Sequence, residues 1–203
     1  MKWYKFDIRD LTAADYEKWY ALMSEDKQMR VNRFRFVDDK KRAVAGEMLA
    51  RKAIAEWCGI SAESIVFEKT ETGKPYAKDL PMEFNISHSG DMVVCAVDDK
   101  PVGIDIEKIR PIDLTVAKRI CTDDELLYLF GHTPIKEDFI YTTDGEPLIR
   151  FFQLWTMKEA QSKRTGKGIA GLNDEHIFYS QTMKINDSYV LSISLSPEAT
   201  SAF

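Results

Sequence analysis

The chain has 203 residues and a formal net charge of −5, with 44% of its residues hydrophobic and 30% charged. This length and composition fit one compact domain or two small fused ones. The acidic balance argues against a general nucleic-acid binder, which needs an excess of lysine and arginine to neutralise phosphates. Three widely spaced cysteines, with no CxxC pair, argue against a disulfide framework and a zinc site. Because no apolar run is long enough to span a bilayer and charges interrupt the N-terminal residues, we expect a cytoplasmic protein without membrane contact.

The first half is predicted to contain two helical stretches followed by short strands. Residues 12–23 look helical, and residues 38–60 carry small and apolar side chains at spacings of three and four, with Gly59 as the terminator. Strand-length runs separated by glycine, proline and aspartate follow at 64–77, 82–90, 92–99 and 102–109. We expect these four runs to form an antiparallel meander.

The second half has a similar order of elements. A helix is predicted at 115–130, a long loop at 131–147, a second helix at about 149–164, and strands at 176–185 and 188–195. Two helices followed by strands thus occur twice. We therefore predict two halves, residues 1–108 and 109–203, with the boundary between residues 108 and 113.

Two acidic residues follow each other at strand spacing in the segment VGIDIEKI. Asp105 and Glu107 would share one face of the strand, roughly 7 Å apart at about 3.3 Å per residue, and could share a hard cation such as Mg²⁺. Gly103 on the same face would leave room for a bulky group. For an isolated D-x-E, two solvated acids on an amphipathic strand are the commoner interpretation.

The segment LWTMKEAQSK combines an acid and a base within one helical turn. Phe152, Trp155, Glu159 and Lys163 fall on one helical stripe, so the apolar end would anchor the polar end. A pair at i, i+4 is usually a surface ion pair worth a few tenths of a kcal/mol. The stripe alone therefore does not distinguish chemistry from a solvated salt bridge.

Three further segments carry groups suited to phosphate. Lys74 lies in the turn GKP with Pro75, and Ser87 and His88 lie at the end of the strand FNISHSG. Upstream, the segment MRVNRFRF places three arginines among phenylalanines, at positions 30, 33 and 35. Each feature alone is more typical of an exposed turn or a charged helix face.

In chain order, the segments RF (33–34), DDKKRAVAGEMLAR, TGKPY, FNISHSG, VGIDIE and LWTMKEAQSKRTGKGI resemble the successive motifs of the surfactin-type 4'-phosphopantetheinyl transferases. The resemblance covers residues 33–169. It implies an α+β fold of two similar halves related by pseudo-twofold symmetry, each a small antiparallel sheet packed with helices. It also implies a monomer that binds coenzyme A between the halves.

The resemblance further implies a reaction and a set of site residues. Such enzymes transfer 4'-phosphopantetheine from coenzyme A to a serine of an apo acyl or peptidyl carrier protein and release adenosine 3',5'-bisphosphate. Asp105, Glu107 and Glu159 would hold Mg²⁺, with Mn²⁺ as a substitute; Glu159 would act as the general base, and Lys163 would stabilise phosphate charge. Contacts to coenzyme A would come from Arg33, Lys74, Pro75, Ser87, His88 and Lys163.

Some features stay open at this point. Relatives often have further lysines before the Arg-Phe motif, and neither Lys18 nor Lys27 can be aligned securely with those lysines. Trp155 is assigned to packing that fixes the register of the helix. The loop at 131–147 is either mobile or part of the carrier-docking surface. The alternative functions are a noncatalytic coenzyme A-binding module, a Mg²⁺-dependent nucleotide pyrophosphatase and a plain interaction domain.

Overall fold

The computed structural model describes residues 1–71, 73–166 and 180–196. The first half comprises, in chain order, β1 (Lys2–Asp7), α1 (Ala13–Ala21), α2 (Glu25–Arg33), α3 (Val37–Cys58), β2 (Phe67–Lys69), β3 (Pro75–Ala77), β4 (Glu83–Ser89) and β5 (Met92–Asp98). The second comprises β6 (Gly103–Lys108), β7 (Ile112–Asp113), α4 (Ala117–Ile120), α5 (Asp123–Phe130), β8 (Tyr141–Thr142), α6 (Glu146–Thr165), β9 (Ser180–Asn186) and β10 (Tyr189–Ser194).

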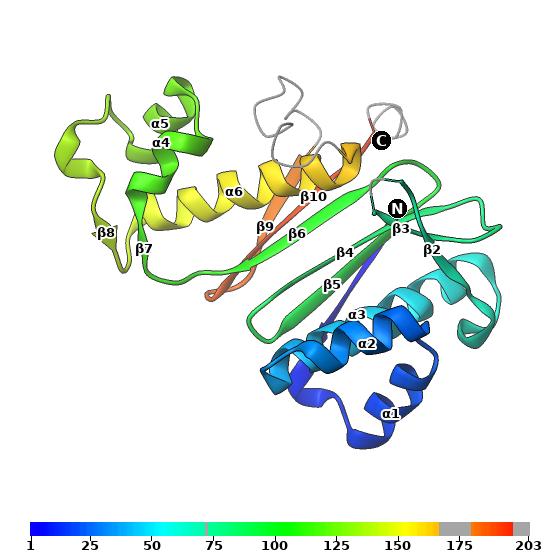
Figure 1. Cartoon of the computed structure of the whole chain (residues 1–203). Coiled ribbons are helices and arrows are strands. Elements are labelled where there is room, and N and C mark those ends of the chain that lie inside the picture. The colour runs from blue at the N-terminus through cyan, green and yellow to red at the C-terminus, as the bar shows by residue number, and fades with distance from the viewer. Residues whose placement is uncertain (72, 167–179, 197–203) are drawn as a thin grey trace.

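Each half contains one long helix and one three-stranded antiparallel sheet (Figure 1). In the first half the strand order is β1-β5-β4 and the long helix is α3; in the second the order is β6-β10-β9 and the long helix is α6. Strand, helices, long helix and hairpin therefore follow one another twice, with β6 in the place of β1. The predicted α+β fold of two similar halves is confirmed.

The predicted meander of four strands is wrong in its pairing. Strands β4 and β5 do form an antiparallel hairpin, but β2 pairs, among the described strands, only with β3, and β6 pairs with β10 instead of β5. The reason is that β1 occupies the other edge of β5, from Lys2 opposite Val97 to Asp7 opposite Met92. Strand β1 was not expected, because its six residues carry charges at both ends.

Strand β5 lies between the two halves, and all seven of its residues are buried. Val93, Cys95 and Val97 belong to the core under α3, while Met92, Val94 and Ala96 belong to a second core with the β6–β10 sheet. Strand β6 also lies along β4. Because β6 belongs to the second sheet and still contacts the first, the boundary at residues 108 to 113 stays a prediction.

Helix boundaries follow local capping signals. Helix α3 ends at Gly59, whose φ of 69° is left-handed, as the sequence indicated. The predicted helix at 115–130 is broken before α5, because Thr122 and Glu125 form a capping box. Ser24 likewise caps α2, a separate helix that the prediction did not resolve.

The remaining predictions concern the C-terminal region and membrane contact. The predicted loop at 131–147 contains β8, which pairs with β7. The predicted strand at 176–185 is seen from residue 180, and residues 176–179 lie outside the described part of the chain. None of the described helices combines the length and the apolar character that a bilayer crossing requires.

Candidate active site

Strand β6 presents its two acids toward one pocket. Its alternate residues Ile104 and Ile106 are fully buried in the core, so Asp105 and Glu107 share the opposite face. Gly103 does not leave room for a ligand, contrary to expectation. A Cβ there would lie 1.9 Å from the carbonyl oxygen of Ala160, so the missing side chain allows the backbone of α6 to approach.

Helix α6 supplies the other two charged groups of the pocket. Glu159 and Lys163 both line it, together with Trp155, whose ring also stacks on Phe151 with centroids 6.5 Å apart. Within the described part of the chain, no hydrogen bond or ion pair joins Glu159 to Lys163. Instead, the Nζ of Lys163 reaches across to β6 and lies 2.6 Å from Asp105 Oδ1. The basic residue is therefore not a solvated surface partner of Glu159.

Strand β4 closes the pocket from the first half of the chain. The Oγ of Ser87 donates to Asp105 Oδ1 at 2.7 Å and accepts from Lys163 Nζ at 2.9 Å. His88 follows it in the strand and lines the same pocket, and desolvation of the ring lowers the pKa of His88. The resulting pocket has a volume of about 280 Å³ and is lined by Ile86, Ser87, His88, Asp105, Glu107, Trp155, Glu159 and Lys163.

Two of the three acids of this pocket, Asp105 and Glu159, are held at an electrostatic cost. Burial raises the pKa of Asp105, while Lys163 and Ser87 act against the rise. Burial also raises the pKa of Glu159; Lys163 opposes this shift, and Asp105 and Glu107 add to it. Acids in such surroundings gain from a cation that neutralises them.

The donor set of the pocket suits a hard divalent cation. Asp105 Oδ2 is buried and accepts no hydrogen bond in the described part of the chain, so it is an oxygen without a partner. Carboxylate oxygens are the ligands that Mg²⁺ prefers. Among the described residues, no three acidic, histidine or cysteine side chains already stand close enough together to enclose a metal ion. The three acids thus fit Mg²⁺ by the type of their donor atoms and not by an assembled coordination geometry, and Lys163 contacts one of them, Asp105.

A second pocket, of about 380 Å³, borders the first. Ile86 and His88 line both pockets, and the second also contains Lys27 and Arg30 from α2. Sequence reasoning did not assign these two cations to the site. The sequence did raise Arg30 among the arginines suited to phosphate and Lys27 among the lysines before the Arg-Phe motif, and their spacing of three residues places both on one face of a helix.

The other predicted nucleotide contacts are distributed around this second pocket. Pro75 lines it. Lys74 does not; its Nζ forms an ion pair with Glu83 at 2.8 Å. Arg33 is exposed at the C-terminal end of α2 and does not line either pocket. Lys18 forms an exposed ion pair with Glu63.

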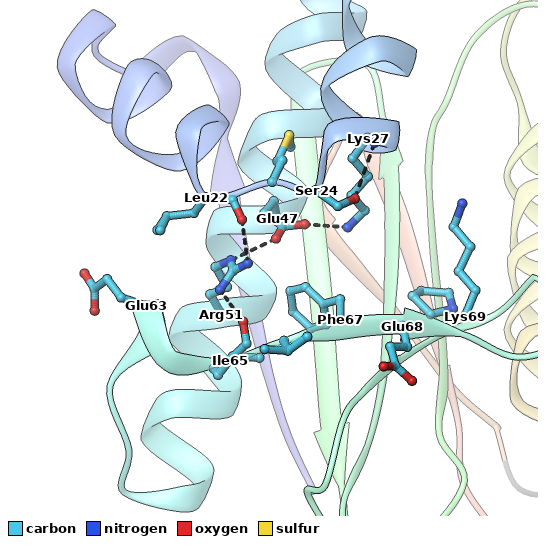
Figure 2. Close-up of a pocket in the computed structure, with 13 residues that line it drawn as sticks. Leu22, Ser24, Lys27, Glu47, Arg51, Glu63, Ile65, Phe67, Glu68 and Lys69 are labelled. Carbon is cyan, nitrogen blue, oxygen red and sulfur yellow. Dashed lines mark hydrogen bonds and ion pairs between the residues drawn. The ribbon is translucent and has the colours of Figure 1, made fainter.

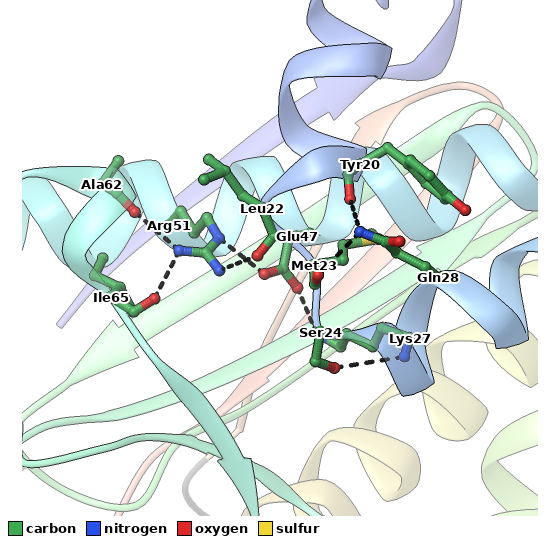
Figure 3. Close-up of polar contacts among 10 residues, drawn as sticks. All are labelled: Tyr20, Leu22, Met23, Ser24, Lys27, Gln28, Glu47, Arg51, Ala62 and Ile65. Atoms are coloured by element: carbon green, nitrogen blue, oxygen red, sulfur yellow. Dashed lines mark hydrogen bonds and ion pairs between the residues drawn. The ribbon is translucent and has the colours of Figure 1, made fainter.

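Lys27 is held in place by a buried network of ion pairs and hydrogen bonds (Figures 2 and 3). Glu47, on α3, is 2% exposed and forms ion pairs with Lys27 and with Arg51, whose Nε lies 2.8 Å away. Arg51 in turn donates to the carbonyl oxygens of Leu22, Ala62 and Ile65. The network thus ties the start of α2 to α3 and to the segment before β2.

A third pocket, of about 310 Å³, is lined in part by the residues of this network (Figure 2). Both this pocket and the second one are lined by Met23, Lys27, Glu47 and Pro75. The ring of Phe67 forms part of its wall, with Lys27 Nζ 5.0 Å from the ring centroid. The second and third pockets therefore meet at Lys27, which faces both.

Comparison with known proteins gives two family matches that together cover most of the chain. Residues 10–100 match the model described as 4'-phosphopantetheinyl transferase, N-terminal, and residues 101–196 match the 4'-phosphopantetheinyl transferase superfamily. The chain is 44% identical over 155 residues to 4'-phosphopantetheinyl transferase psf-1 of Bacillus pumilus, covering 76% of this chain and 62% of that protein. It is 36% identical over 163 residues to 4'-phosphopantetheinyl transferase Sfp of Bacillus subtilis, covering 80% and 68%. The chain thus spans about two thirds of these relatives, and it belongs to the surfactin-type 4'-phosphopantetheinyl transferases.

Proposed function

We propose that this protein transfers the 4'-phosphopantetheine group of coenzyme A to a serine hydroxyl of an apo acyl or peptidyl carrier protein in the presence of Mg²⁺ or Mn²⁺. The products would be the holo-carrier and adenosine 3',5'-bisphosphate. One observation carries the proposal: Asp105, Glu107, Glu159 and Lys163 line one pocket, and a pocket with two further cations borders it. This arrangement suits a substrate with a pyrophosphate at one point and a phosphorylated nucleoside beside it.

Coenzyme A would occupy the two bordering pockets. Its pyrophosphate would lie near Lys163 and Ser87, and its 3'-phosphate near His88 and the two cations of α2, Lys27 and Arg30. Pro75 would support the adenosine end. We assign Lys74 and Arg33 to outer phosphate contacts, since neither of them lines these two bordering pockets.

Asp105, Glu107 and Glu159 would hold the metal ion. Mg²⁺, when bound, would neutralise charge on the pyrophosphate and favour its cleavage. The oxygen Asp105 Oδ2, which is buried without a hydrogen-bond partner in the described part of the chain, supports this assignment. A carboxylate left in this state without a ligand would be costly.

In the transfer, the serine oxygen of the carrier forms a bond to the phosphorus that carries the pantetheine. The bond from that phosphorus to the bridging oxygen breaks, and adenosine 3',5'-bisphosphate leaves with the bonding electrons. Glu159 accepts the proton of the serine hydroxyl, a role that a carboxylate beside the reacting centre can fill. Lys163 stabilises the charge on the phosphate oxygens.

The test is intact-protein mass spectrometry of a panel of apo carrier proteins incubated with this protein, coenzyme A and Mg²⁺. We expect a gain of one phosphopantetheine that EDTA abolishes and that a carrier with its acceptor serine changed to alanine does not show. Cleavage of coenzyme A without a carrier would identify a pyrophosphatase. Binding of coenzyme A without transfer to any carrier would identify a noncatalytic module.

A further inference from the structure

Side chains, in place of a backbone ladder, connect β4 to β6 where the two halves meet. The acceptors lie at every second position of β4 and the donors at every second position of β6: Asn85 Oδ1 accepts from the N–H of Ile104 at 3.0 Å, Ser87 Oγ from Ile106 at 3.5 Å, and Ser89 Oγ from Lys108 at 3.1 Å. This regular spacing fixes the register of the two strands. It also places the hydroxyls of both serines beside the acids of β6.

Both acids of β6 then show the same pattern of one occupied and one available oxygen. Asp105 Oδ1 accepts from Ser87 and Lys163, and its Oδ2 is buried without a hydrogen-bond partner in the described part of the chain. Glu107 Oε2 accepts from Ser89 at 2.6 Å and from Arg110 at 3.2 Å. No described residue bonds Glu107 Oε1. Each acid therefore has one oxygen fixed by the protein and one left for a ligand.

The two partners of Glu107 differ in their surroundings. The side chain of Arg110 is 58% exposed, so its ion pair is screened by water and contributes little to the position of the carboxylate. Ser89 is half-buried between the strands, and its short bond to an ionised oxygen is of the stronger, charge-assisted kind. Ser89 does not line the pocket. It can therefore influence a ligand there only through Glu107.

We propose that Ser89 is a positioning residue, whose hydroxyl fixes Oε2 of Glu107 at the pocket and leaves Oε1 for a divalent cation. Without that hydroxyl, Glu107 would keep only its exposed partner Arg110 and would be free to turn toward it. This inference rests on the proposed function, in which Glu107 is a metal ligand. Partners that orient a ligand commonly change metal affinity by about 10- to 100-fold when they are removed.

Three variants test this role: Ser89→Ala, Ser89→Thr and Asn85→Ala. Asn85 is the matched control, because it makes the same kind of bond between the strands but contacts neither acid. The readout is Mn²⁺ affinity in the presence of coenzyme A, measured from the electron paramagnetic resonance signal of free Mn²⁺. We expect Ser89→Ala to weaken binding about tenfold. Ser89→Thr, which keeps the hydroxyl, and Asn85→Ala should both stay within about threefold of wild type, a margin below the 10-fold lower limit of such effects.

Unchanged Mn²⁺ affinity in Ser89→Ala would overturn the proposal, and so would an equal loss in Asn85→Ala. If Asn85→Ala fails to fold, the comparison of Ser89→Ala with Ser89→Thr decides alone. Carrier modification by the wild-type protein is measured in parallel. An active wild-type protein whose Ser89→Ala variant binds Mn²⁺ normally would overturn this inference alone, whereas a wild-type protein that modifies no carrier would overturn the proposed function.

Discussion

At the scale of one residue, Lys163 shows how a side chain predicted to form an ion pair on a helix surface instead contacts a buried carboxylate of the candidate site. Its spacing from Glu159 suggested a helix surface pair, but its Nζ lies against Asp105, a carboxylate that is only 4% exposed. A cation in such a place stabilises buried negative charge and is available to a phosphate oxygen. The sequence could place Lys163 on the correct face of α6. It could not show that β6 lies opposite.

We expect Lys163→Ala to lower kcat for carrier modification by about 100-fold or more, the range typical of losing one group that stabilises developing charge. The matched control is Lys18→Ala, which removes the exposed ion pair with Glu63 and should leave turnover unchanged. Steady-state kinetics with a purified apo carrier measures both. Wild-type turnover in Lys163→Ala would show that its contact with Asp105 is only structural.

Glu47 plays a similar part in the second pocket, because it is a buried carboxylate that forms ion pairs with basic side chains. Its side chain is 1% exposed and neutralises both Lys27 and the buried Arg51. Removing one partner from a buried ion pair leaves the other charge uncompensated, which typically costs about 3–5 kcal/mol. We therefore expect Glu47→Ala to lower the free energy of unfolding in urea by about that amount.

The control for this variant is Glu56→Ala, which removes an exposed, solvent-screened ion pair with Lys2 and should leave the free energy of unfolding close to that of wild type. Any folded Glu47→Ala protein should also show a raised KM for coenzyme A, because Lys27 is no longer held. A stability equal to that of Glu56→Ala would contradict the structural role of the network.

At the scale of elements, the contact between β6 and α6 depends on Gly103. A Cβ at this position would lie 1.9 Å from Ala160 O and 2.6 Å from Arg164 N, and these are backbone atoms that cannot move alone. We expect Gly103→Ala to separate α6 from β6, to lower stability by about 3 kcal/mol, the upper end of typical overpacking costs, and to abolish transfer. Thermal and urea unfolding measure the first effect, and carrier modification measures the second.

Gly46→Ala is the matched control for stability. Gly46 lies inside α3, and a Cβ there would meet Ile86 at an ordinary 3.5 Å. Because alanine favours the helix by about 1 kcal/mol over glycine, this variant should be as stable as wild type or more so. A Gly103→Ala protein that unfolds like the Gly46→Ala protein would show that α6 and β6 can separate without cost.

Elements whose signals are local could be predicted from the sequence, and contacts between distant elements could not. Helix α3 with Gly59, the β4–β5 hairpin and most of α6 follow from periodicity and turn residues. The break at Thr122 could have been found from its capping box with Glu125. The pairing of β6 with β10 joins residues more than 80 positions apart, and no local pattern encodes it.

The same distinction applies to the candidate site. The spacing of Asp105 and Glu107 and that of Glu159 and Lys163 predicted which side chains share a face. Their meeting in one pocket depends on β6 packing on α6, which is a tertiary contact. The roles of these residues stay predictions until they are tested by substitution.

At the scale of the whole molecule, the pocket lies where β4 of the first half meets β6 and α6 of the second, and apolar side chains pack between the halves on the other face of β6. The core residues Val94 of β5 and Ile104 of β6 are fully buried with other apolar side chains, while the acids face away from that core.

We therefore expect EDTA to abolish carrier modification and Mg²⁺ or Mn²⁺ to restore it. The fold should persist, because apolar burial and not metal ligation holds the halves together. Far-UV circular dichroism and the Tm measured with and without EDTA test the second expectation. A cooperative loss of structure on chelation would mean that the metal joins the halves, and full transfer activity in EDTA would remove the metal from the reaction.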